Sequence, residues 1–88
     1  MLFRSLIPTP LRSYTRQKRL VEADGATVGA VLDDLEGQFP GIRFRMVDEH
    51  DRMCRHMRLF VNGEQVFDLS RALKAADEIA IVQALSGG

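Results

Sequence analysis

Residues 27–41, TVGAVLDDLEGQFPG, predict the one main helix of this chain. Thr27 is placed as the N-cap, because its hydroxyl can accept a hydrogen bond from an N–H of the first turn. Pro40 disfavours helical geometry at the residue before it, and Gly41 follows as a stop signal. The apolar side chains recur at i, i+3, i+4, i+7 and i+11, which is the spacing of a single buried helical stripe: Val28, Val31, Leu32, Leu35 and Phe39.

Two strands are expected before this helix. The first runs from Leu2 to Ile7, a short apolar stretch that Pro8-Thr9-Pro10 stops. The second is expected near Lys18 to Glu22, after a turn region through Ser13 and Tyr14. The two strands would form a hairpin, and the residues Asp24-Gly25-Ala26 break the strand pattern before the helix.

The residues after the helix predict three further strands. Residues 41–55 show no clear period, so we expect a turn of helix or a loop there. Apolar residues alternate from Met57 to Val61, and Asn62-Gly63 is a hairpin signal leading to a short strand around Gln65–Phe67. The last strand is expected at Ile79–Ala84. The resulting order is ββαβββ, an α+β fold with a mixed sheet of four to five strands packed on one main helix.

Strand alternation divides the side chains between two faces of this sheet. Ile79 and Ile81 should face one way, and Ala80, Val82 and Ala84 the other. Leu69 and Leu73 are expected to fill the core beneath a one-turn segment. Seven strand residues are expected to face the helix: Phe3, Ile7, Met57, Leu59, Val61, Ile79 and Ile81.

The chain ends in Leu85-Ser86-Gly87-Gly88, which suits an end that must enter another protein. Glycine has no Cβ, so a Gly-Gly end gains nothing from packing but can thread a narrow channel. Its α-carboxylate, with a reference pKa of roughly 3.5, is ionised at neutral pH and can act as a nucleophile. We therefore expect residues 1–84 to form the domain and residues 85–88 to be a flexible tail.

Composition limits the classes of function. The 88 residues make one domain, and 45% hydrophobic content is enough for one core. Twelve Lys and Arg balance twelve Asp and Glu, which argues against bulk attraction to nucleic acid or to an anionic membrane. The single cysteine, Cys54, fits a reducing compartment, and the first residues contain no signal-peptide core. A cytoplasmic protein is expected.

Two other clusters are weighed against a reactive tail. His50, Cys54 and His56 fit none of the usual metal-ligand spacings, so we predict no metal site, and a partly buried thiol is the simpler interpretation of Cys54. The chain also holds basic residues in two groups, which favour a solvated surface or an acidic protein partner over RNA: Arg12, Arg16, Lys18 and Arg19, and Arg43, Arg45, Arg52, Arg55 and Arg58.

Taken together, these features resemble the ubiquitin-like sulfur carriers, which have the β-grasp fold. The features are the Thr27–Leu35 helix start, the Phe39-Pro40-Gly41-Ile42 exit, the Val61-Asn62-Gly63 hairpin, the Asp77-Glu78-Ile79 entry to the last strand and the Gly-Gly end. The group includes the small subunit of molybdopterin synthase, the thiamine-pathway carrier and the carrier used for cysteine biosynthesis. One departure is Ala75-Ala76-Asp77-Glu78, which lacks the glycine of the usual Asp-Gly-Asp-Glu, so this turn is expected to be built differently.

The resemblance implies a carrier that is not itself an enzyme. Its terminal glycine, here Gly88, would be adenylated by a partner enzyme of the ubiquitin-activating type and converted to a thiocarboxylate that an acceptor biosynthetic enzyme uses. ATP and magnesium would belong to the adenylating partner, a sulfur donor enzyme would be needed, and the chain itself would bind no cofactor. Two alternatives remain open: a protein modifier joined to lysines through Gly88, and an interaction module with an inert tail.

A docking surface is expected on the sheet face opposite the helix. Strand alternation sends Leu6, Phe60 and Val82 to that face, and in a β-grasp order their three strands are neighbours. The patch would lie on the strand that leads directly into Leu85, so an enzyme that grips it would also aim Gly88.

Overall fold

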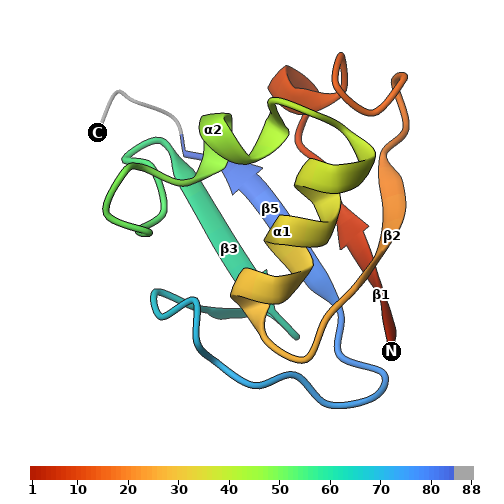
Figure 1. The fold of residues 1–88 in the computed structure, drawn as a ribbon, viewed down its shortest axis with the longest axis vertical. Coiled ribbons are helices and arrows are strands. Elements are labelled where there is room, and N and C mark those ends of the chain that lie inside the picture. Colours follow the sequence, from red (N-terminus) through yellow and green to blue (C-terminus); the bar gives the residue numbers. More distant parts are fainter. Residues whose placement is uncertain (85–88) are drawn as a thin grey trace.

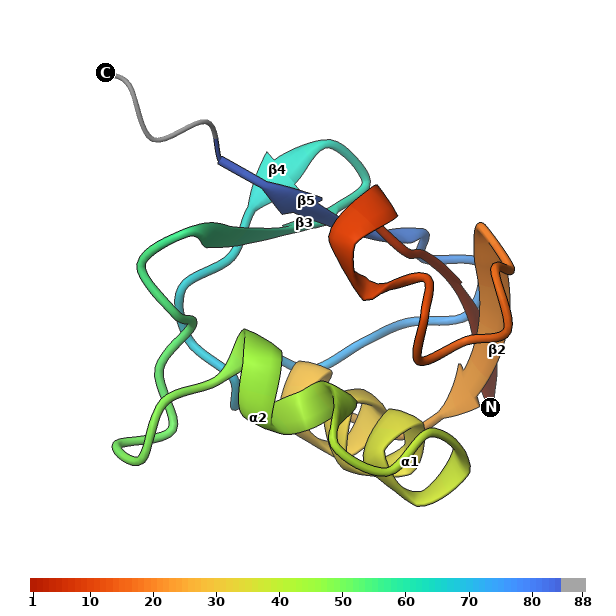
Figure 2. The same cartoon turned by 90° about the horizontal axis from the view of Figure 1, so that it is seen from above.

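The computed structural model describes residues 1–84 as a single mixed sheet with both α-helices on one face of it (Figures 1 and 2). The strand order is β2-β1-β5-β3-β4, in which β1 and β5 are parallel and the other neighbours antiparallel. This is the predicted α+β fold with the order ββαβββ. The elements are β1 (Leu2–Leu6), the 3-10 helix η1 (Thr9–Leu11), β2 (Leu20–Asp24), α1 (Val28–Gln38), α2 (Ile42–Met46), β3 (Met57–Val61), β4 (Glu64–Gln65) and β5 (Ile79–Gln83).

Helix α1 begins as predicted. The N–H of Ala30 donates a hydrogen bond to Thr27 Oγ1 at 3.1 Å. Two further N–H groups of the first turn donate to carbonyls of the loop after β4, from Val28 to Arg71 and from Gly29 to Leu69. The loop therefore satisfies N–H groups that a helix start leaves unpaired. A single hydrogen-bonded turn forms in this loop at residues 69–70, closed by the N–H of Arg71 donating to the carbonyl of Asp68 at 3.1 Å, as the expected one-turn segment requires.

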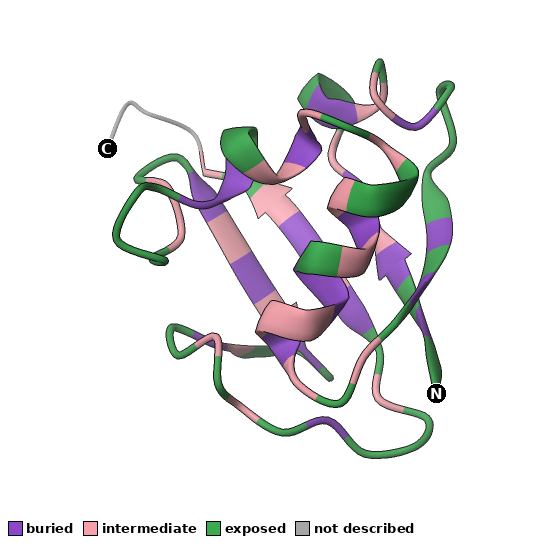
Figure 3. Ribbon diagram, in the orientation of Figure 1, coloured by how far each residue is buried: buried purple, intermediate pink, exposed green. Residues whose placement is uncertain are grey.

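The core lies between α1 and the inner face of the sheet (Figure 3). All seven strand residues predicted to face the helix are buried, and so are four of the five stripe residues of α1. The fifth, Phe39, is half-buried at the C-cap. Leu73 is buried and Leu69 packs partly against the core, as expected.

Strand β2 begins two residues later than predicted. The preceding segment, from η1 to Lys18, is occupied by turns in which Arg16 and Gln17 have positive φ. Thr15 fixes this segment, since its buried hydroxyl donates to the carbonyl of Lys18 at 2.9 Å. Strand β4 begins one residue earlier than predicted, because the two-residue Asn62-Gly63 turn pairs Glu64 directly with Val61.

The turn before β5 contains a positive φ although it has no glycine. Ala76, at the position of the usual glycine, adopts φ 72°, and the different construction expected for this turn stays a prediction. Asp77 holds the turn, because its carboxylate accepts from the N–H of Lys74 at 2.8 Å and from Asn62 Nδ2 at 2.9 Å. The same two hydrogen bonds, the first above all, lower the pKa of Asp77 below its ordinary value.

Candidate functional site

Strand β5 is the last element of the described chain, and its final residue, Gln83, lies at one end of the sheet. Gln83 is paired with Met57 of β3, and the N–H of Ala84 donates to the carbonyl of His56 at 2.7 Å. The backbone is thus anchored up to the residue before the predicted tail. Leu85, Ser86, Gly87 and Gly88, the predicted reactive end, lie outside the described residues.

An apolar row crosses the sheet face that points away from the helices. Ala80 of β5 is the register partner of both Leu6 of β1 and Phe60 of β3, and Leu6 is also paired with Leu20 of β2. Paired residues share a face, so these four side chains follow one another across four strands. Leu6, Ala80 and Phe60 are half-buried, and Leu20 is 55% exposed.

Val82 lies on the same face, two residues farther along β5, where it pairs with Arg58. It lines a shallow hollow together with Leu6. The structure therefore places all three predicted docking residues, Leu6, Phe60 and Val82, on one face, while their binding role stays a prediction. Ala80 was predicted to lie on the same face as Val82 but was not named as a docking residue, and Leu20 was missed.

The other named cluster, His50, Cys54 and His56, does not form a site of recognisable chemistry. Cys54 is partly buried against the core, and burial, with the nearby Asp48 carboxylate, raises the pKa of its thiol. Cys54 and His50 line a hollow of about 750 Å³ between α2 and the loop after α2. Within residues 1–84 no group of three or more His, Cys, Asp or Glu side chains is arranged to hold a metal ion.

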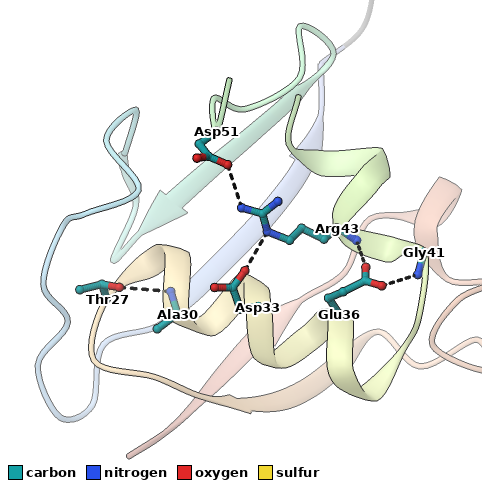
Figure 4. Close-up of polar contacts among 7 residues, drawn as sticks. All are labelled: Thr27, Ala30, Asp33, Glu36, Gly41, Arg43 and Asp51. Carbon is teal, nitrogen blue, oxygen red and sulfur yellow. Dashed lines mark hydrogen bonds and ion pairs between the residues drawn. The ribbon is translucent and has the colours of Figure 1, made fainter. Parts of the chain in front are cut away.

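Polar contacts join α1 to α2 beside this hollow (Figure 4). The Glu36 carboxylate accepts from the N–H groups of Gly41, at 2.9 Å, and Arg43, at 3.0 Å. These two bonds lower the pKa of Glu36 below its ordinary value. Arg43 in turn forms ion pairs with Asp33 at 2.9 Å and Asp51 at 3.2 Å. The start of α2 and the loop behind it are therefore held against α1.

The helices in the described part of the chain are all too short or too polar to cross a bilayer.

Comparison with known proteins identifies relatives of this fold. The model of the ThiS family matches residues 6–88. The sulfur carrier protein CysO of Mycobacterium tuberculosis is 37% identical over 93% of this chain and 94% of its own length. Small archaeal modifier protein 1 of Haloferax volcanii is 38% identical over 77% of this chain and 78% of its own length.

A solved structure shares the fold closely. The crystal structure of the Amycolatopsis orientalis BexX/CysO complex contains a chain that is 37% identical. It matches with a TM-score of 0.89, covering 98% of this chain and 99% of that chain. Together with the family match over nearly the whole length, this likeness leads to one conclusion: the chain belongs to the ThiS family, the ubiquitin-like sulfur carriers of the β-grasp fold.

Proposed function

We propose that this protein carries sulfur as a thiocarboxylate on Gly88. The observation that carries the proposal is that the final strand of a sulfur-carrier fold leads, after only a few residues, into a terminal Gly-Gly. No side chain encumbers the last two residues, so the carboxylate can reach a buried active site in another protein. The chain is the substrate of that partner and is not itself an enzyme.

The proposed chemistry proceeds in two steps. An oxygen of the ionised Gly88 carboxylate attacks the α-phosphate of ATP in the adenylating partner, and pyrophosphate leaves with magnesium that the partner holds. A sulfide or persulfide sulfur from a donor enzyme then attacks the acyl carbon and expels AMP; when the sulfur comes from a persulfide, the S–S bond must afterwards be cleaved by a thiol reductant. The C-terminal thiocarboxylate that results would transfer its sulfur to an acceptor biosynthetic enzyme.

The cysteine-forming pathway is the first acceptor pathway to test, ahead of molybdopterin and thiamine synthesis. Relatives named CysO match 93% of this chain, which supports this order. The Amycolatopsis orientalis BexX/CysO complex holds a similar chain together with another protein, which supports a function exercised through partner enzymes. We place that activity in the cytoplasm, with no nucleic acid and no membrane involved.

The apolar row and Val82 are the proposed docking surface for these enzymes. Leu6, Ala80 and Phe60 follow one another across the three central strands, and Val82 lies two residues before the end of the described chain. A partner that covers this face would hold β5 and thereby direct the residues that follow it. Phe60 is the aromatic side chain of the surface, and aromatic residues often dominate binding energy.

A protein modifier is the second candidate function. It is supported by the similarity to small archaeal modifier protein 1. In this case a lysine amine of a target, rather than sulfur, would displace AMP and form an isopeptide bond with Gly88. An inert interaction module is the third possibility, and it would need no activation at all.

ATP–pyrophosphate exchange with the adenylating enzyme of the same organism tests the activation step. The full chain should support exchange, and a variant lacking Gly88 should not, although its thermal midpoint should be unchanged. Exchange that persists without Gly88 would contradict the proposal. Gly-Gly remnants on target lysines after proteolysis would favour the modifier, and the absence of both activation and remnants would favour the inert module.

A further inference from the structure

Four arginines from separate parts of the sequence gather at the end of β5. Arg12 and Arg19 line one hollow with Gln83, and Arg45 lines another hollow with Gln83. Arg58 is on β3, where it pairs with Val82. These four residues, here called the tail-base arginines, therefore surround the end of the strand from which residues 85–88 continue.

Within the described part of the chain, no acidic side chain neutralises them. None of the four takes part in the ion pairs found among residues 1–84. No Asp or Glu lines either of the two hollows at Gln83. Asp48 and Glu49 of the loop after α2 line a different hollow, beside Glu36 and Arg43.

Two of the tail-base arginines are held in place by backbone carbonyls, which leave their charge intact. Arg12 Nε donates to the carbonyl of Ile7 at 3.1 Å, and Arg58 Nη1 donates to that of Arg55 at 3.2 Å. Side chains ordered in advance lose less conformational entropy when a partner binds. Arg19 and Arg45 are exposed.

The opposite end of the sheet carries charges of both signs, since the Met1 ammonium, paired with Asp24 at 2.6 Å, and Lys74 lie there beside four acidic residues. Asp77 and Glu78 immediately precede β5, Glu64 pairs with the last residue of β3, and Asp24 ends β2. The tail-base arginines thus place positive charge, without an ion-pair partner among residues 1–84, at the end where the chain leaves the sheet. A local concentration of positive charge steers the approach of an acidic partner before contact.

We propose that the tail-base arginines dock on an acidic rim around the channel of the protein that receives residues 85–88. This inference rests on the proposed function and adds the chemistry of the partner surface. The partner is a protein rather than RNA, because the two hollows at Gln83 contain one exposed aromatic side chain, Phe44, instead of a stacking platform interleaved with the arginines. Arginine suits such a rim, since its planar fork pairs with carboxylates in a fixed geometry.

The test is the affinity of charge variants for the adenylating enzyme of the same organism. Arg19→Glu combined with Arg45→Glu reverses two exposed charges whose side chains make no hydrogen bond within residues 1–84. We expect its dissociation constant to rise about tenfold or more at low salt, and the difference to shrink as NaCl rises from about 50 to about 300 mM. Arg19→Lys with Arg45→Lys, which keeps the charge, should remain within about twofold of wild type.

Lys74→Glu is the matched control, since it reverses an exposed charge on the loop before β5, at the opposite end of the sheet. It should bind as the wild type does. The inference would be overturned if the Arg19→Glu, Arg45→Glu variant bound the enzyme with wild-type affinity. An equal loss of affinity in Lys74→Glu, or in the variant with Arg19→Lys and Arg45→Lys, would overturn it as well. So would preferential binding of the wild type to a single-stranded oligoribonucleotide.

Pyrophosphate exchange measured in parallel separates this inference from the proposed function. If the wild type supports exchange and the charge reversals leave the dissociation constant unchanged, only the proposal of an acidic rim is wrong. Neither exchange nor binding by the wild type would show that both are wrong.

Discussion

The carboxylate of Glu36 accepts the backbone N–H of Gly41 at 2.9 Å, which ties the last turns of α1 to the start of α2. A second bond from Arg43 completes the contact. Helix α2 carries Arg45, one of the tail-base arginines, so this pair of residues positions part of the surface at the end of β5.

Glu36→Gln should make stability less dependent on pH. The folded-state pKa of Glu36 is lowered, so its charged form stabilises the fold above the ordinary pKa of 4.5. That contribution is lost as the pH falls through the lower, folded-state pKa. Urea unfolding between about pH 7 and about pH 2.5 should therefore show the variant less stable at neutral pH, with the difference vanishing in acid. A difference that is independent of pH would contradict this assignment.

Ala76→Gly should stabilise the protein. A positive φ destabilises alanine by about 1–2 kcal/mol, and glycine would remove this strain. Glycine also gives the unfolded chain more conformational entropy, which offsets part of the stabilisation. The expected net increase in the free energy of unfolding is about 0.5–1 kcal/mol, measured by denaturant titration. Ala75→Gly is the control, because Ala75 is not among the residues with positive φ, and it should bring no gain. Equal effects of the two substitutions would refute the argument from φ.

Gly25→Ala should destabilise the fold strongly. A Cβ at Gly25 would lie 2.7 Å from the backbone nitrogen of Val31 and 2.9 Å from the carbonyl carbon of Ala30, so α1 would have to shift. We expect a loss of about 2–3 kcal/mol in the free energy of unfolding. Gly37→Ala is the matched control within α1, because a Cβ there meets nothing within 4 Å. It should add about 0.5–1 kcal/mol through helix propensity, and a loss in both variants would contradict this account.

Local patterns were sufficient to predict the main helix and the five strands of this fold, whereas η1 was not predicted and α2 was expected only as a turn of helix or a loop. The 3.6-residue spacing of the α1 stripe and the alternation from Met57 to Val61 depend only on neighbouring residues, and both were confirmed. The late start of β2 could not be anticipated, because it depends on a buried hydroxyl, that of Thr15, and on positive φ at Arg16 and Gln17.

The site is harder to predict because it depends on which strands are neighbours. The face of Leu6, Phe60 and Val82 follows from alternation, but the continuous row needs the pairing of Ala80 with both flanking strands. The tail-base arginines belong to two basic groups of the sequence, and only the fold brings Arg12 and Arg45 to the same strand end.

Phe60→Arg should weaken binding of the adenylating enzyme. Phe60 is half-buried on the open face, beside Ala80, so the substitution removes an aromatic contact there. We expect a loss of about 2 kcal/mol or more in binding free energy, with a smaller change in stability. Phe67→Arg adds the same charge at a side chain that is 74% exposed and outside β4, and its affinity should be unchanged. Unchanged affinity in Phe60→Arg, or loss of the fold, would exclude Phe60 as the anchor.

The intact mass of the protein isolated with its partner enzymes tests the central proposal most directly. The account predicts a fraction heavier by the exchange of one oxygen for sulfur, located at Gly88 by fragmentation and present equally in a Cys54→Ser variant. A chain lacking Gly88 should show no such fraction. Unmodified mass in the presence of active partners, or added sulfur that disappears with Cys54, would contradict the assignment of this chain as a carrier of a C-terminal thiocarboxylate.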